Sequence, residues 1–117
     1  MILIVDDEPG VRNAMDKWLR AHGFETDTAE NGAEAVEKCR HNRYELVTMD
    51  LEMPQMSGVE AIQLIKRDNP DISIVVLTGF TSDVETFHSV TVQAVLVKPV
   101  RMQELEETIR GILERAC

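Results

Sequence analysis

The stretch Val47–Gly58, VTMDLEMPQMSG, decides the fold because it shows where an apolar strand ends and a turn begins. Residues 44–49 have the short apolar run of a buried strand, and a carboxylate, Asp50, follows directly. Glu52 comes two residues later, and Met53-Pro54 then breaks the extended run. The first question is therefore what a carboxylate does at the end of a buried strand.

Short strands and helices alternate along the whole chain. Strands are expected at residues 2–5, 24–28, 44–49, 72–77 and 94–97. The segments between them share an apolar face at helical spacing: Val11, Met15, Trp18 and Leu19; Ala35, Val36 and Cys39; Val59, Ile62 and Ile65; Met102, Leu105, Ile109, Ile112 and Leu113. This alternation predicts an α/β fold in which helices cover both faces of a mostly parallel sheet. The run 24–28 alternates polar with apolar residues and is expected at a sheet edge.

Length, charge and cysteine content limit the function classes. A chain of 117 residues fits one domain over residues 1–117. A formal net charge of −9 disfavours direct binding to a nucleic-acid backbone, which needs clustered Lys and Arg. No apolar run approaches the roughly 20 residues of a membrane span. Cys39 and Cys117 have no metal-type spacing, and a reducing cytoplasm is the expected setting.

Acidic and other polar residues follow the predicted strands. They are Asp6 and Asp7 after the first strand, Asp50 after the third, Thr78 after the fourth and Lys98 after the fifth. Because the carboxyl ends of parallel strands share one edge, where ligands bind, these side chains are expected to meet. If the first and third strands are neighbours, three carboxylates converge and call for a cation, for which Mg²⁺ is the natural choice. Lys98 and Thr78 then suit a phosphoryl group, and Asp50 is the acid best placed to attack phosphorus.

Four motifs resemble those of response-regulator receiver domains. They are VDDE at 5–8, MDLEMPQMSG at 49–58, LTG at 77–79 and VKP at 97–99, and they cover nearly the whole chain in the family's order. The resemblance implies a flavodoxin-like, doubly wound α/β fold whose five parallel strands have the order 2-1-3-4-5. It also implies a cytoplasmic, phosphorylation-controlled switch that is not an enzyme. Such a switch has a histidine kinase or phosphotransfer protein upstream and an effector downstream, and it binds neither nucleic acid nor membrane itself.

The resemblance also implies how the metal and the phosphoryl group are held. Asp50 would accept the phosphoryl group from a phosphohistidine, and Asp7 and Asp50 would ligate Mg²⁺, with Asp6 acting through a bound water. The backbone carbonyl of Glu52 would complete the metal shell. Lys98 would pair with Asp50 and later with the phosphoryl group. In similar domains the bond between this lysine and the following proline is cis.

The switch itself departs from the family pattern. Thr78 would move to bond a phosphoryl oxygen, but the Tyr or Phe that usually turns inward with it is replaced by Val95. We expect residues 81–93 to reorder instead, with Phe80 or Phe87 replacing the missing ring. The surface formed by residues 81–93, 94–97 and the last helix would carry the output and, as in similar domains, could form a homodimer. Glu52 and Phe80 would adjust how fast water attacks the acyl phosphate.

Two other functions compete with the switch. A Mg²⁺-dependent phosphatase with an aspartyl-phosphate intermediate would use the same carboxylates, but such hydrolases place an Asp-x-Asp pair after their first strand. Here that strand ends in the adjacent acids Asp6 and Asp7, and the later pair is Asp50-Leu51-Glu52. A constitutive binding module that kept the fold without the switch ranks well behind the switch, because all five side chains of the expected site are present.

Overall fold

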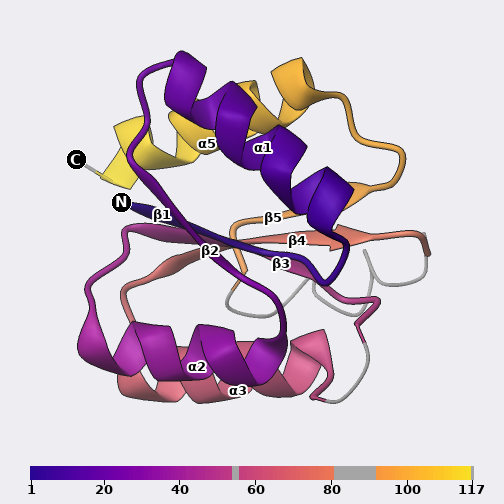
Figure 1. The fold of residues 1–117 in the computed structure, drawn as a ribbon. Coiled ribbons are helices and arrows are strands. Elements are labelled where there is room, and N and C mark those ends of the chain that lie inside the picture. The colour runs from indigo at the N-terminus through magenta and orange to yellow at the C-terminus, as the bar shows by residue number, and fades with distance from the viewer. Residues whose placement is uncertain (54–55, 81–91, 117) are drawn as a thin grey trace.

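Five parallel strands form the centre of the molecule, and helices lie on both sides of them (Figure 1). The computed structural model describes residues 1–53, 56–80 and 92–116. Its elements are β1 (Ile2–Val5), α1 (Pro9–Ala21), β2 (Thr26–Ala29), α2 (Gly32–His41), β3 (Leu46–Asp50), α3 (Gly58–Asp68), β4 (Ser73–Thr78), β5 (Ala94–Val97) and α5 (Met102–Ala116). The sheet order is β2-β1-β3-β4-β5, which confirms the expected fold and strand order. Residues 81–93, which we expect to reorder, lie almost wholly within residues 81–91, outside the described part.

Alternate residues of each strand face opposite layers of helices. Leu3 and Val5 of β1 belong to a hydrophobic cluster with α2 and α3, whereas Ile2 and Ile4 pack with α1 and α5. Figure 1 shows these layers, with α1 and α5 above the sheet and α2 and α3 below it. The continuous apolar runs of β1 and β4 follow from this arrangement, because a strand covered on both faces needs apolar residues at every position.

Three of the five strands, β2, β3 and β4, differ from the sequence prediction at both ends. β3 and β4 each extend one residue further, so Asp50 and Thr78 are the last residues of their strands. Ladder pairing causes this, because Asp50 is still in register with Leu77 of β4. β2 begins at Thr26 because Phe24 donates its backbone N–H to the Leu19 carbonyl (3.0 Å) and so belongs to the turn that ends α1.

The helix boundaries follow local signals. The Asn31 side chain accepts the Glu34 N–H (2.8 Å) and caps α2. Gly23 follows α1 with a φ of 95°, a conformation that glycine adopts at little cost. The prediction was wrong for Val59, which is 40% exposed, because the buried face of α3 runs through Ala61, Ile62 and Ile65 instead.

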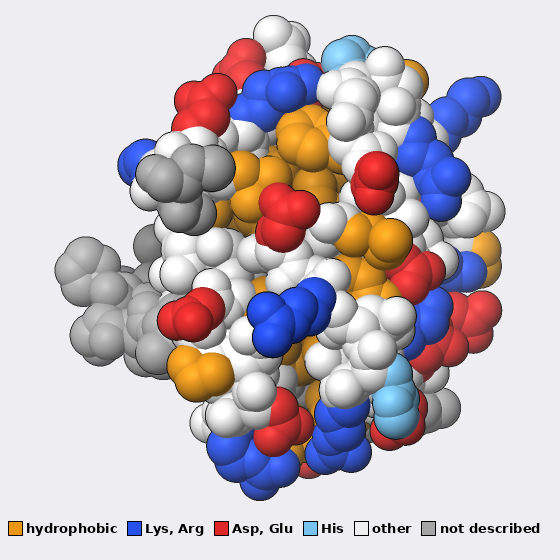
Figure 2. Space-filling view, turned by 90° about the vertical axis from the view of Figure 1, so that its left-hand side faces the viewer, with side chains coloured by type: hydrophobic (Ala, Val, Ile, Leu, Met, Phe, Trp, Pro, Cys, Tyr) orange, Lys and Arg blue, Asp and Glu red, His pale blue; other side chains and the backbone are white. Residues whose placement is uncertain are grey.

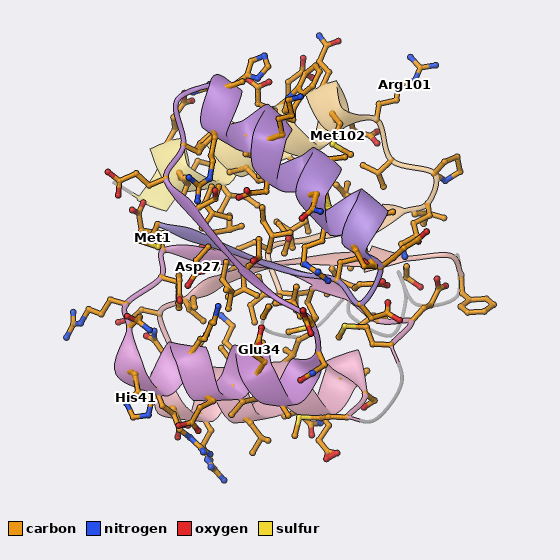
Figure 3. All side chains as sticks on the ribbon, viewed as in Figure 1. Met1, Asp27, Glu34, His41, Arg101 and Met102 are labelled. Carbon is orange, nitrogen blue, oxygen red and sulfur yellow. The ribbon has the colours of Figure 1, made fainter. Side chains whose placement is uncertain are left out.

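β2 forms one edge of the sheet, as its alternating sequence predicts. Figure 3 shows Asp27 of this strand on the side that faces α2. The Tyr44 hydroxyl donates to Asp27 Oδ2 (2.6 Å), and Lys38 Nζ lies 3.3 Å from Asp27 Oδ1. These two partners, Lys38 from α2 and Tyr44 from the loop before β3, hold Asp27 on the α2 side of the edge.

The end of the sheet at which the strands begin carries charges of both signs. Figure 2 shows this face, where Lys and Arg side chains are interspersed with Asp and Glu around a small hydrophobic area. Such mixing does not create the uniformly positive surface that phosphate backbones require. No helix within residues 1–53, 56–80 and 92–116 is long and apolar enough to cross a membrane.

Candidate functional site

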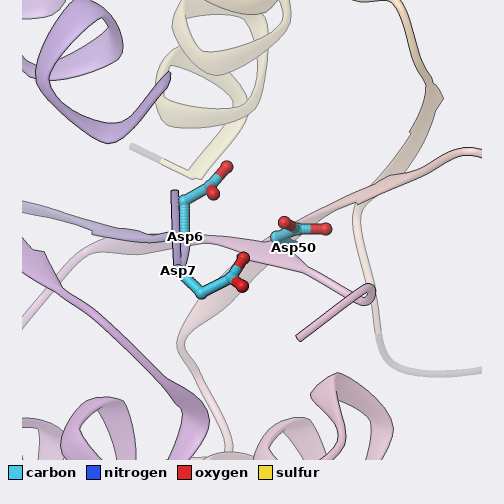
Figure 4. A group of neighbouring side chains, drawn as sticks. All are labelled: Asp6, Asp7 and Asp50. Atoms are coloured by element: carbon cyan, nitrogen blue, oxygen red, sulfur yellow. The ribbon is translucent and has the colours of Figure 1, made fainter. Parts of the chain in front are cut away.

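Three acidic side chains meet at the carboxyl edge of the sheet. Asp6 and Asp7 follow β1, and Asp50 ends the neighbouring β3 (Figure 4). One carboxylate oxygen from each lies within 4.8 Å of the others. The sequence prediction that these acids converge is therefore confirmed, and the cause is the β1–β3 pairing, which places Val5 beside Met49.

The Asp50 carboxylate is almost completely buried. Its side chain is only 3% exposed, yet its Oδ1 accepts two hydrogen bonds, one from the Glu52 backbone N–H (2.9 Å) and one from Lys98 Nζ (2.9 Å). Both donors fix the orientation of the carboxylate. A buried charge needs such partners, because removing either would leave it poorly solvated.

Asp6 is buried with incomplete hydrogen bonding. Its Oδ1 accepts the Glu8 N–H (2.9 Å), but its buried Oδ2 has no hydrogen-bond partner among the described residues. Burial raises the pKa of Asp6 above its ordinary value, and the charges of Asp50 and Asp7 raise it further. An unpartnered buried oxygen beside two other carboxylates is the environment that a hard divalent cation would relieve, so the residues fit Mg²⁺.

Lys98 supplies the positive charge of the site. Its backbone N–H donates to the Thr78 carbonyl (2.7 Å), which continues the β4–β5 ladder beyond Val97 and carries the side chain toward Asp50. Burial lowers the pKa of Lys98, but the hydrogen bond that its ammonium donates to Asp50 and the charges of Asp50, Glu52 and Asp6 outweigh this effect and raise the pKa overall. The Lys98-Pro99 bond is cis, as the resemblance implies.

Thr78 and the two residues after it border the same pocket. Thr78 is fully buried, and its hydroxyl oxygen accepts the backbone N–H of Phe80 (3.2 Å). The Phe80 ring, by contrast, is 62% exposed. Val95 is half-buried and packs against the cluster formed with α2 and α3, so this position itself supplies no aromatic ring. Phe87, the other aromatic expected to act, lies outside the described residues.

The Glu52 side chain makes contacts that sequence reasoning did not find. Its Oε1 accepts the Gly79 backbone N–H (2.7 Å), and its Oε2 lies 3.5 Å from Lys98 Nζ. Gly79 was also missed as a site residue. Its position directly after Thr78 in the LTG motif was the available signal, because the first residue beyond a strand can present a backbone N–H at the sheet edge.

Two further features surround the acids. Arg12 of α1 donates from Nη1 to the Asp6 backbone carbonyl (2.9 Å) and so fixes the turn between β1 and α1. Beside Asp6 and Lys98 lies a largely apolar hollow of about 660 Å³, lined by residues of α1 and by the chain that enters α5. Figure 3 marks Arg101 and Met102 on that segment, at the start of α5.

The fold and this edge define a doubly wound α/β protein with an acidic pocket where β1 and β3 end. The chain belongs to the response regulator receiver domain family, whose model matches residues 2–110. Receiver domains are regulatory phosphoacceptor domains that work with histidine kinases and downstream effector domains, and they bind Mg²⁺ at an acidic pocket.

Similar proteins agree with this assignment. The response regulator Rre1 of Synechocystis is 36% identical to this chain, and the match covers 97% of this chain and 52% of Rre1. The transcriptional regulatory protein PrrA of Mycobacterium tuberculosis is 31% identical, and the match covers 97% of this chain and 50% of PrrA. The chain thus spans about half the length of these relatives. Among solved structures, the response regulator TrrA of Thermotoga maritima, in complex with Mg²⁺-BeF, is 37% identical with a TM-score of 0.87 over 95% of this chain and 96% of that one. A CheY-like receiver domain of Methanospirillum hungatei is 25% identical with a TM-score of 0.92, and the match covers 98% of this chain and 94% of that one.

Proposed function

We propose that Asp50 accepts a phosphoryl group from a phosphohistidine on a partner protein, and that the resulting acyl phosphate switches the surface of this domain. The observation that carries the proposal is the setting of the Asp50 carboxylate, which Lys98 and the Glu52 N–H orient beside Asp6 and Asp7. A carboxylate oxygen attacks phosphorus, an O–P bond forms, and the P–N bond of the donor breaks with its electron pair leaving on the imidazole.

Asp7 and Asp50 would hold Mg²⁺, together with the Glu52 carbonyl, while Asp6 would act through a bound water. The ion would neutralise charge that develops on the phosphoryl oxygens. The unpartnered Oδ2 of Asp6 supports this assignment, because it is a buried oxygen available to a metal-bound water. The raised pKa of Asp6 agrees with it, because burial first, and the charges of Asp50 and Asp7 next, disfavour an uncompensated carboxylate there. Asp7, which is exposed, leaves one side of the pocket open to solvent.

Lys98 and Thr78 would bind the phosphoryl group once it is on Asp50. The Lys98 ammonium already lies 2.9 Å from Asp50 Oδ1, so a small displacement would let it pair with a phosphoryl oxygen. Thr78 sits at the end of the adjacent strand, and its hydroxyl would donate to a second oxygen. Positioning of this kind is the main contribution a protein makes to phosphoryl transfer.

The output would begin at Phe80, because Val95 offers no ring to turn inward. A hydroxyl that moves toward the phosphoryl group would give up the Phe80 N–H, which Thr78 now accepts at 3.2 Å. The exposed Phe80 ring would then change its position, and the change would pass to the surface of residues 81–93, β5 and α5, which is proposed to bind an effector or a second copy of this domain. Glu52 and Phe80 would also adjust the lifetime of the acyl phosphate, because they lie two residues past Asp50 and two residues past Thr78, the positions that adjust water attack in similar domains.

The whole protein is proposed to act in the cytoplasm as a two-component regulator. The curated relatives are about twice as long as this chain, and PrrA is a transcriptional regulator. An effector that contacts DNA would therefore belong to another part of the protein, since the net charge of this domain is −9.

One experiment separates the switch from the phosphatase. The protein is incubated with Mg²⁺ and a small acyl-phosphate donor, and intact mass and released phosphate are followed, with Asp50→Asn as the matched control. The switch predicts one labile phosphoryl group per chain, absent from the control and from samples without Mg²⁺. Rapid turnover of simple phosphate monoesters would favour the phosphatase, and an unlabelled wild-type protein would refute the proposal.

A further inference from the structure

The Glu52 carboxylate interacts with two of the hydrogen-bond donors beside Asp50, the Gly79 N–H and the Lys98 ammonium. Oε1 accepts the Gly79 N–H at 2.7 Å, and Oε2 lies 3.5 Å from Lys98 Nζ, which is at the same time 2.9 Å from Asp50 Oδ1. The side chain thus connects the end of β4 to the lysine after β5, across the carboxylate that would be phosphorylated. Its own backbone N–H donates to that carboxylate as well.

Glycine at position 79 makes this approach possible. A Cβ built on Gly79 would lie 2.5 Å from Glu52 Oε1, closer than real Cβ atoms come to other heavy atoms. Any other residue would push the carboxylate away from the N–H. The contact between Glu52 and Gly79 is therefore a specific fit of these two residues and not an incidental surface contact.

We infer that in the unphosphorylated domain the Glu52 carboxylate occupies donors that a phosphoryl group on Asp50 would need, and that phosphorylation displaces it. The inference rests on the proposed function of Asp50 and deepens it. A phosphoryl group, like a carboxylate, is an anion with acceptor oxygens, and here the Gly79 N–H and the Lys98 ammonium lie beside Asp50. Glu52 is then an internal competitor for the phosphoryl group.

The exposure of the two acids decides which one moves. The Asp50 side chain is 3% exposed and is held in a strand, whereas the Glu52 side chain is 38% exposed and lies in the loop beyond it. Lys98 is the one cation within 4.0 Å of these acids among the described residues, and a phosphoryl group would add further negative charge beside it. The added negative charge therefore displaces the Glu52 side chain, which can rotate toward the solvent and be hydrated again at little cost.

Three variants test the competition in the intact chain. Glu52→Ala removes both the charge and the acceptor, Glu52→Gln removes the charge but keeps an oxygen that can accept the Gly79 N–H, and Glu25→Gln makes the same charge change at the opposite edge of the sheet. Phosphorylation rates with a small acyl-phosphate donor and Mg²⁺ are measured by intact mass. The amide resonance of Gly79 and its hydrogen exchange are measured by NMR without donor or metal.

We expect Glu52→Ala to take up the phosphoryl group about three- to tenfold faster than the wild type, the effect of removing one partly exposed charged contact. Glu52→Gln should be intermediate, and Glu25→Gln should match the wild type. In the unmodified protein the Gly79 resonance should shift and its exchange should accelerate in Glu52→Ala alone. Equal phosphorylation rates for Glu52→Ala and Glu52→Gln would show that Glu52 acts only through charge repulsion and not by occupying a donor. An unchanged Gly79 resonance in Glu52→Ala would show that Glu52 does not accept the Gly79 N–H. Either result overturns the competition.

The two proposals fail in different ways. If neither the wild type nor any variant gains a phosphoryl group, the proposed function of Asp50 is wrong, and the competition by Glu52 is refuted as well. If all variants are labelled at the same rate, phosphorylation of Asp50 stands and the role of Glu52 is refuted.

Discussion

Replacing Thr48 by valine should make the protein more stable. Thr48 lies inside β3, paired with Ile4 on one side and Val75 on the other, and it is fully buried. Its hydroxyl oxygen is buried and has no hydrogen-bond partner among the described residues. The hydroxyl has therefore lost its hydration without a replacement, whereas a methyl group of nearly the same size would pack among apolar neighbours.

The magnitude follows from the cost of an unsatisfied buried polar group. Such a group costs about 1–3 kcal/mol, and valine and threonine have similar strand preferences, so we expect Thr48→Val to raise the free energy of unfolding by about 1–2 kcal/mol. For a domain of this size that corresponds to an increase in melting temperature of about 4–8 °C.

Thr26 provides a matched control in β2. It is also buried, but its hydroxyl accepts from Arg20 Nε (2.9 Å) and donates to Asp16 Oδ1. Thr26→Val removes both hydrogen bonds and should lower the free energy of unfolding by about 1 kcal/mol, because the two partners are partly exposed. Urea unfolding of both variants, followed by circular dichroism without donor or metal, measures the two effects. A neutral or destabilising Thr48→Val would show that this hydroxyl is hydrogen-bonded in solution and would refute the reasoning.

Shorter predictions concern three other positions, Gly58, Cys39 and Phe80. A Cβ on Gly58 would lie 2.7 Å from the Leu51 side chain, so Gly58→Ala should destabilise the fold by about 1–3 kcal/mol in urea unfolding, whereas Gly10→Ala, with no atom within 4 Å of its Cβ, should be neutral or slightly stabilising. Burial raises the pKa of Cys39 from 9.0 to about 11, so in a Cys117→Ser background its alkylation at pH 8 should be slow until urea unfolds the chain. The same shift makes the thiol's contribution to stability fall as pH rises above about 9, because the unfolded thiol ionises first; a Cys39→Ala variant should lack this dependence. Fluorophenylalanine at position 80 should change its ¹⁹F shift when Asp50 is phosphorylated, and an unchanged shift would remove Phe80 from the output.

Most of the fold could be predicted because its signals are local and repeated. β1 and β5 were predicted with their observed bounds, since each is a four-residue apolar run with clear limits. The cap at Asn31 and the end of α3 before Pro70 were also readable from residue type alone. The predictions are wrong where contacts with other elements determine the end of a strand or the burial of a side chain. Asp50 and Thr78 extend their strands through pairing with neighbours, and Val59 is exposed although its spacing fits the apolar face.

The site was predictable as a set of residues, but its internal contacts were not. Strand-end positions identified Asp6, Asp7, Asp50, Thr78 and Lys98, because parallel strands bring such positions to one edge. The Glu52 side chain could have pointed into water, into the pocket or toward either neighbouring loop. Only the position of the β4–β5 end relative to β3 determines that Gly79 and Lys98 are its partners. The spacing of these residues in the sequence carries no information on how close the Glu52 side chain lies to Gly79 and Lys98.

The Gly79-Phe80 segment connects the site to the rest of the molecule. Two backbone N–H groups hold it in place, that of Gly79 on the Glu52 carboxylate and that of Phe80 on the Thr78 hydroxyl. Under the functions proposed here, a phosphoryl group on Asp50 would draw Thr78 toward itself and expel Glu52, so both acceptors would leave together. Release of the segment would then need no aromatic ring at Val95, because the change would pass along the backbone that leads into residue 81. A substitution that keeps only one acceptor should weaken this coupling without abolishing phosphorylation.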